Sequence, residues 1–142
     1  MKAAVDIRCE NGVWADLRIT NDENKAARIL NPGNYRPTES WEFSREAYQI
    51  AVLRSFHFLE MTLRAEDGLA VEPADIASRA DHIVGLPVEL EPGAELLISV
   101  PLHEFYDLKR NREYSLALTY GDDSARVSAA TRVRCSAPAP RA

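Results

Sequence analysis

The stretch that decides the fold runs from Leu86 to Tyr120 and reads LPVELEPGAELLISVPLHEFYDLKRNREYSLALTY. It starts with a Pro-Gly turn and an apolar strand, which are followed by a compact Phe-Tyr-Asp-Leu turn at 105–108. The strand after this turn alternates large apolar residues at every second position, namely Tyr114, Leu116, Leu118 and Tyr120. The stretch therefore predicts two strands joined by a corner. We expect the hydroxyl of Tyr114 to tie that corner to the backbone, as a tyrosine often does in β-sandwiches.

Two strands near the start of the chain have the same period of two. Apolar side chains alternate with polar ones over residues 5–10 and again over 13–20. Asn11-Gly12 lies between the two runs, and this pair supplies the positive backbone dihedrals of a tight hairpin turn. The first 20 residues are therefore predicted to form a β-hairpin.

The rest of the chain has weaker strand patterns separated by turns. Further strands are predicted at 26–30, 49–53, 57–65, 69–71 and 126–135, the one at 69–71 ending before Pro73, which blocks further pairing. The segment 35–48 has no sustained period, although residues 38–46 are compatible with a helical turn. Residues 74–85 read as a loop, also with room for one helical turn.

These short strands predict an all-β fold, an antiparallel immunoglobulin-like β-sandwich of about seven or eight strands without a long helix. A chain of 142 residues fits one domain, which we place at residues 1–135. Residues 136–142 are rich in alanine and proline and are expected to form a flexible tail.

Charge and hydropathy narrow the choice of partners. The net charge is −5 and the basic residues are scattered, so nucleic acid is not an expected partner. No apolar run approaches the roughly 18 residues that a membrane-spanning helix needs, and no hydrophobic signal region follows Met1. As written, the sequence favours a soluble cytoplasmic protein. A periplasmic or secreted location is the alternative if a signal peptide has been removed.

The two cysteines leave one question open. Cys9 and Cys135 lie near opposite ends of the chain, and the first and last strands of an immunoglobulin-like sandwich often run side by side. A disulfide between them is therefore an alternative, but the missing signal region favours two free thiols in a reducing compartment.

Catalytic motifs are not evident. The three histidines, His57, His82 and His103, are dispersed and lack partners at a familiar ligand spacing, so surface or corner positions are expected. Among them, only His103 lies in a run, His103-Glu104-Phe105-Tyr106-Asp107, that is similar to a zinc-peptidase motif. The second histidine is replaced by Asp107, and the setting after Pro101 predicts a strand end instead of a helix. We expect no catalytic residue, no metal and no cofactor.

Aromatic residues gather in the irregular segment before the middle of the chain. Aromatic side chains on loops can anchor a protein partner, although they can equally cap the open end of a sandwich core. The candidate partner-binding residues are Tyr35, Trp41, Phe43 and Tyr48.

The order of these features resembles the immunoglobulin-like N-terminal region that accompanies some zinc peptidases of the deuterolysin and peptidyl-Lys metallopeptidase group. The matching pieces are 17–21, 27–31, 58–60 up to Asp67-Gly68, 90–93, Leu102, 105–108 and Tyr114. The resemblance covers nearly the whole chain and implies a companion domain without catalytic residues, since the peptidase chemistry of that group lies in a separate domain.

Three functions follow as hypotheses. The first is a non-enzymatic module that binds a protein, with an inhibitor or immunity-type partner of an enzyme as one version. The second is a structural module that forms a homodimer through a sheet edge or face. The third is a metal-dependent hydrolase with a site made by His103, Glu104 and Asp107.

Overall fold

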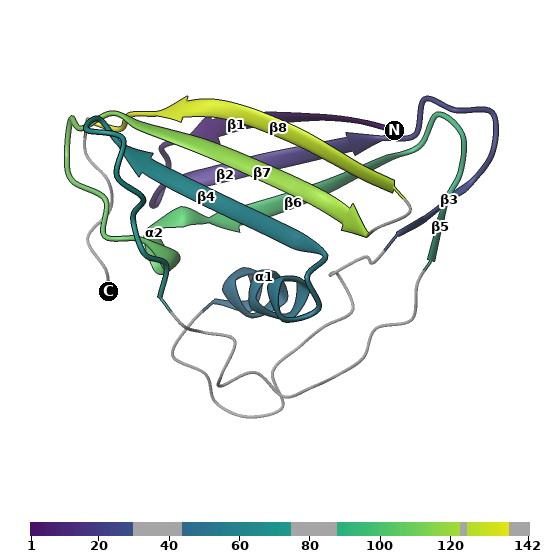
Figure 1. The fold of residues 1–142 in the computed structure, drawn as a ribbon, viewed down its shortest axis with the longest axis horizontal. Helices are drawn as coiled ribbons and strands as arrows, with labels where there is room; N and C mark the ends of the chain where they lie inside the picture. The colour runs from purple at the N-terminus through teal and green to yellow at the C-terminus, as the bar shows by residue number, and fades with distance from the viewer. Residues whose placement is uncertain (30–43, 75–87, 123–124, 137–142) are drawn as a thin grey trace.

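The structure is a computed structural model that describes residues 1–29, 44–74, 88–122 and 125–136. In these ranges the chain forms eight strands and two helices (Figure 1). In chain order they are β1 (Lys2–Arg8), β2 (Trp14–Thr20), β3 (Ala27–Ile29), α1 (Arg45–Ser55), β4 (Leu59–Ala65), β5 (Val88–Leu90), β6 (Glu95–Pro101), α2 (Leu102–Phe105), β7 (Tyr114–Asp122) and β8 (Ala125–Val133).

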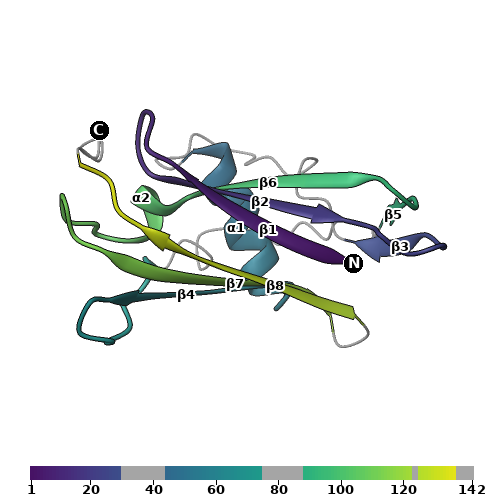
Figure 2. The ribbon, with the colours of Figure 1, turned by 90° about the horizontal axis from the view of Figure 1, so that it is seen from above.

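The strands form two three-stranded antiparallel sheets and one small ribbon. One sheet has the order β1-β2-β6, the other has the order β4-β7-β8, and β3 pairs with β5. Strands β1 and β8 run side by side, so the two sheets meet along one seam (Figure 2). The prediction of an all-β antiparallel sandwich with about seven or eight strands is confirmed.

Alternation of large apolar and small or polar residues builds the core between the sheets. In β7 the predicted apolar positions are all buried, and Ser115 and Ala117 between them are exposed. In β2, Ala15, Leu17 and Ile19 are buried in the same way. The hairpin turn expected at Asn11-Gly12 is also present, because both residues have positive φ values.

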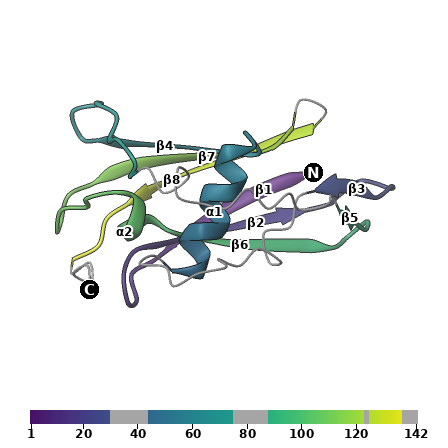
Figure 3. The same cartoon turned by 90° about the horizontal axis from the view of Figure 1, so that it is seen from below.

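Helix α1 corrects the prediction of a strand at 49–53. It has 11 residues and starts after Ser44, whose hydroxyl accepts a hydrogen bond from the backbone N–H of Ala47 at 3.1 Å. The helix lies across the side of the sandwich opposite the seam and contacts β6 and β4 (Figure 3). The short apolar run at 50–53 fits a buried strand or a buried helix equally, and burial against both sheets selects the helix.

The corner between β6 and β7 also differs from its prediction in one respect. The residues after Pro101 form the four-residue helix α2, so His103 lies on a helical turn and not on a strand end. The prediction for Tyr114 is confirmed, because its hydroxyl accepts a hydrogen bond from the backbone N–H of Lys109 at 2.9 Å. The corner is therefore held at both ends, by α2 and by the tyrosine.

Candidate functional site

His103 packs onto the hairpin between β1 and β2. Its Nδ1 lies 3.1 Å from the backbone N–H of Val13, which donates to it, and its ring meets the ring of Trp14 edge-on with 5.3 Å between centroids. Gly12 leaves room for the imidazole, since a Cβ at this position would collide with the ring. These contacts fix α2 against the first hairpin.

Glu104 joins the two helices. Its Oε1 accepts a hydrogen bond of 2.8 Å from the backbone N–H of Ser44, and its Oε2 accepts one from the Ser44 hydroxyl. Asp107 instead lies on the surface and forms an ion pair of 2.9 Å with Lys109. In the described ranges no group of three or more His, Cys, Asp or Glu side chains could hold a metal ion. The structure therefore does not bring His103, Glu104 and Asp107 together as ligands.

The cysteines form a disulfide, which differs from the free thiols that the sequence favoured. Cys9 follows β1 and Cys135 follows β8, and their Cα atoms lie 5.9 Å apart. The bridge forms because the two strands run along the same seam, as the sandwich prediction allowed. It joins positions 126 residues apart and therefore closes most of the chain into one loop.

The aromatic cluster does not form the predicted binding surface at the one position that can be checked. Tyr48 lies in α1 and is fully buried, because the helix packs this face against the core. Tyr48 is therefore wrong as a surface contact. Tyr35, Trp41 and Phe43 lie outside the described residues, and so do His82 and most of the predicted loop at 74–85.

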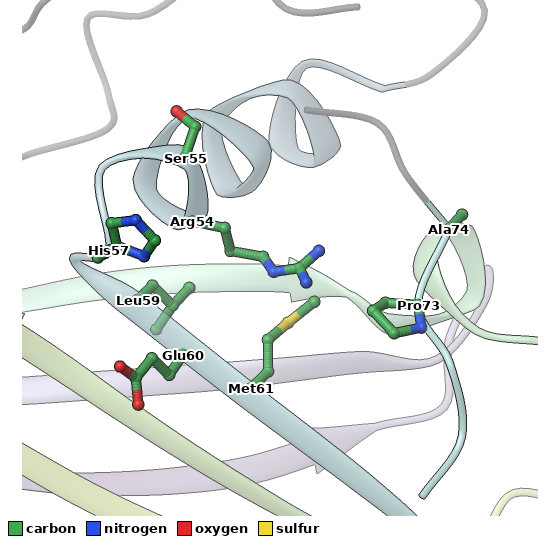
Figure 4. Close-up of a pocket in the computed structure, with 8 residues that line it drawn as sticks. All are labelled: Arg54, Ser55, His57, Leu59, Glu60, Met61, Pro73 and Ala74. Carbon is green, nitrogen blue, oxygen red and sulfur yellow. The ribbon is translucent and has the colours of Figure 1, made fainter. Parts of the chain in front are cut away.

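A pocket of about 430 Å³ opens between the C-terminal end of α1, the first half of β4 and the segment Pro73-Ala74 (Figure 4). This volume is in the range of ligand pockets in proteins. The lining residues are Arg54, Ser55, His57, Leu59, Glu60, Met61, Pro73 and Ala74. The lining is mixed, with apolar groups on β4 and polar groups from α1 and from the outer side of β4.

The pocket exists because Pro73 ends a strand pairing along the free edge of β4. The backbone N–H of Ala65 donates to Leu69 at 2.9 Å, and the N–H of Val71 donates to Leu63 at 2.8 Å. Continued in the register of the Arg64–Ala70 bridge, this pairing would place Pro73 opposite Met61. Proline has no N–H to donate, so the pairing stops and the chain leaves the edge.

Arg54 is the most prominent polar group of the pocket. It is half-buried, its guanidinium lies 5.8 Å from the centroid of the Phe105 ring, and it extends between Met61 and Pro73 (Figure 4). Within the part of the chain that the structure describes, no carboxylate lies within ion-pair distance of it. The nearby Glu60 is already paired with Arg126 at 3.3 Å. Arg54 can therefore donate to an anionic group that enters the pocket.

Only one part of this pocket is predictable from the sequence. Pro73 was identified as the end of an edge strand, and this is where the pocket opens. The pattern of the sequence does not indicate that Arg54 and His57 line a pocket, because it predicts a strand at 49–53 and not a helix. A helix prediction with Phe56-His57 as its end would have placed Arg54 in the last turn, facing β4.

Near the pocket, the hydroxyl of Tyr106 is buried and has no hydrogen-bond partner among the described residues. Burial raises its pKa above the ordinary value for tyrosine, while the charge of Arg54 lowers this pKa and the charge of Glu72 raises it, both by less than burial does. Tyr106 is not among the residues that line the pocket.

The outer face of β4, β7 and β8 is a second surface feature. Small side chains occupy its centre, where Thr62 faces Ala117 and Ala117 faces Ala130 across the strands. A shallow hollow of about 330 Å³ lies over them, with Arg64 and Arg132 at one end. The face allows another flat surface to approach the backbone closely.

Comparisons with known proteins add no family to these observations. The chain matches no protein-family model and no curated protein. The resemblance to the companion region of zinc peptidases therefore stays a prediction. In the described ranges, no helix is long and apolar enough to cross a membrane.

Proposed function

We propose that this protein is a non-enzymatic binding module that holds a protein partner at the pocket between α1, β4 and Pro73. The observation that carries the proposal is the combination of a strand edge freed by Pro73 with the guanidinium of Arg54, which has no ion-pair partner among the described residues. A strand edge offers backbone hydrogen bonds to a partner, and a half-buried arginine is the kind of side chain that dominates binding energy at protein interfaces.

The immunoglobulin-like part of the proposal is supported by the order of pairing. In chain order, the first, second and sixth strands form one sheet, and the fourth, seventh and eighth form the other. This corresponds to the separation of strands A, B and E from strands C, F and G in immunoglobulin-like domains, and Tyr114 has the place of their corner tyrosine. Such domains commonly act by contact with other proteins, and an inhibitor or immunity-type partner of an enzyme is one version.

The disulfide helps to choose between the two cellular locations considered for the protein. Disulfides persist in oxidising environments and are rare in the cytosol. The Cys9–Cys135 bridge therefore supports the periplasmic or secreted location over the cytoplasmic one.

Capture from a native lysate of the producing cells tests the proposal. The pocket variant Ala74→Trp fills the space next to Pro73, and the control variant Ala117→Trp adds the same side chain on the outer face of β7. We expect the wild type and Ala117→Trp to retain one stoichiometric partner that Ala74→Trp loses. Retention of the same partner by all three proteins, or no stoichiometric partner for any, contradicts the proposal.

A homodimer is the second candidate function, favoured by the small side chains at the centre of the outer face of β4, β7 and β8. In this case Ala117→Trp is the disruptive variant and Ala74→Trp the control. Light scattering over a range of protein concentrations decides it: a dimer that only Ala117→Trp dissociates supports this candidate, and a concentration-independent monomer excludes it.

A further inference from the structure

We infer that the pocket takes an extended segment of the partner protein that adds to the free edge of β4 and places an acidic side chain against Arg54. The inference rests on the proposed function and names the chemistry of the partner. It has two parts: a backbone part, in which the segment forms hydrogen bonds with Met61, and a charge part, in which its acidic side chain contacts Arg54.

The backbone part follows from the direction of the peptide groups along β4. The N–H of Gly121 donates to the carbonyl of Phe58 at 2.9 Å, so the even-numbered residues of this strand direct their backbone groups toward β7. The odd-numbered residues direct theirs outward, as Leu63 and Ala65 do in their bonds with 69–71. Met61 is next in this series, and among the described residues its outward N–H and carbonyl have no strand partner, because the pairing stops at Pro73.

The charge part follows from the face on which an added residue would lie. Residues opposite each other on neighbouring strands have their side chains on the same face of the sheet. Met61 points toward α1, where the guanidinium of Arg54 lies beside it (Figure 4). A side chain of the added segment opposite Met61 therefore points at Arg54.

An acidic side chain satisfies this position better than any other. A guanidinium presents parallel donors that match the two oxygens of a carboxylate, and the half-buried setting strengthens the interaction. Two acids of the described residues near the pocket do not serve instead: Glu60 is held by Arg126, and Glu72 is exposed on the segment before Pro73. The ring N–H of His57, another lining residue of the pocket, adds a second donor.

Selection of peptides tests the inference without the native partner. A phage-displayed library of random octapeptides is selected on the immobilised full chain as wild type, Arg54→Gln and Arg110→Gln. Arg110 is an exposed arginine that is not among the lining residues of the pocket. We expect peptides from the wild type and from Arg110→Gln to share Asp or Glu at one aligned position. Peptides from Arg54→Gln should lack this preference.

A double-mutant cycle on one selected peptide then measures the contact. Replacing the acidic residue of the peptide by its amide should weaken binding to the wild type about tenfold or more, and should leave binding to Arg54→Gln nearly unchanged. Hydrogen exchange at the amide of Met61 should slow when the peptide is bound. Thermal unfolding of Arg54→Gln confirms that the variant is folded.

Three results overturn the inference: no selected peptides, no coupling between the acidic residue and Arg54, or unchanged exchange at Met61. These outcomes are separable from failure of the proposed function. If lysate capture is lost in Ala74→Trp while the cycle shows no coupling, the pocket binds a partner in another way, and only the acidic extended segment is wrong.

Discussion

Two tyrosines in the corner between α2 and β7 illustrate how the same side chain can have opposite effects on stability. The hydroxyl of Tyr114 accepts a hydrogen bond from the backbone N–H of Lys109. The hydroxyl of Tyr106 is buried without a partner among the described residues. A satisfied buried hydroxyl stabilises the fold, whereas an unsatisfied one lowers its stability.

Phenylalanine substitutions measure this difference directly. Tyr114→Phe should lower the free energy of unfolding by about 1 kcal/mol, because the N–H of Lys109 loses its acceptor. Tyr106→Phe should leave that free energy unchanged or raise it by up to about 1 kcal/mol, because a desolvated hydroxyl is removed. Urea denaturation of both variants checks this, and equal losses in the two would contradict the assignment of their roles.

At the level of single residues, sequence predicted those features that depend on local chemistry. Asn11-Gly12 and Tyr114 were placed correctly, because a tight turn and a strand corner leave a local signature. The roles of Tyr48 and Arg54 were missed, since both depend on which face of α1 meets the sheets. That information is tertiary and does not appear in the spacing of residues along the chain.

Helix α2 is held in position by His103 and Glu104, the two side chains that lie in the run similar to a zinc-peptidase motif. Glu104 accepts hydrogen bonds from the backbone and hydroxyl of Ser44, at the start of α1. Glu104→Gln replaces one carboxylate oxygen by a donor and should lower the free energy of unfolding by about 1–3 kcal/mol. It should also speed hydrogen exchange in the first turn of α1.

The matched control is Asp107→Asn, which alters an exposed ion pair with Lys109 and should change stability by less than about 1 kcal/mol. A chelator should not alter the melting temperature of the wild type. Bound zinc, together with a melting temperature that chelation lowers, would contradict this structural role and restore the hydrolase hypothesis.

The sheet β1-β2-β6 carries a charged network on its outer face that should make stability depend on pH. Burial raises the pKa of Asp16, but the hydrogen bonds from Arg8 and Ser99 outweigh it and hold the pKa of this carboxyl below its ordinary value. A carboxyl with a lowered pKa in the folded state stabilises the fold above its unfolded pKa of about 3.9. This contribution is lost as the pH falls through the folded pKa.

Unfolding measured at a series of pH values below about 5 checks this expectation. The wild type should lose stability on acidification more steeply than Asp16→Asn, which has no carboxyl to protonate at this position. Identical pH dependence of the two proteins would show that the network does not contribute to folding.

The contrast between strands and helices shows what periodicity can predict. Strands β1, β2 and β7 show a period of two because one face of each is buried, or half-buried in the case of β1. In α1 six of the 11 residues are buried, so the apolar run shows no helical period. The helix was therefore read as a short buried strand.

For the whole molecule, the disulfide fixes the seam between β1 and β8 and constrains the unfolded chain. In the chain-entropy model, a bridge over more than 100 residues stabilises a protein by about 5 kcal/mol, with smaller values common in practice. Reduction, or the double variant Cys9→Ala/Cys135→Ala, should lower the free energy of unfolding by about 2–5 kcal/mol. Unchanged urea denaturation after reduction would contradict a bridged native state.

The arrangement of the sheets follows from the sequence, but the pocket does not. Turn residues and alternation predicted the sandwich and the end of pairing at Pro73. The pocket also requires α1 to lie across the open side of the sandwich, with Arg54 in its last turn (Figure 3). The proposed binding pocket therefore exists only in the assembled fold.

Site-specific photo-crosslinking in the producing cells is the most direct test that a protein partner binds at this pocket. A photoreactive residue is placed at His57, on the rim of the pocket, and separately at Arg110, which is exposed at the corner before β7. We expect one discrete crosslinked protein from position 57 and none from position 110. No crosslinked product from position 57, or the same product from both positions, would contradict it.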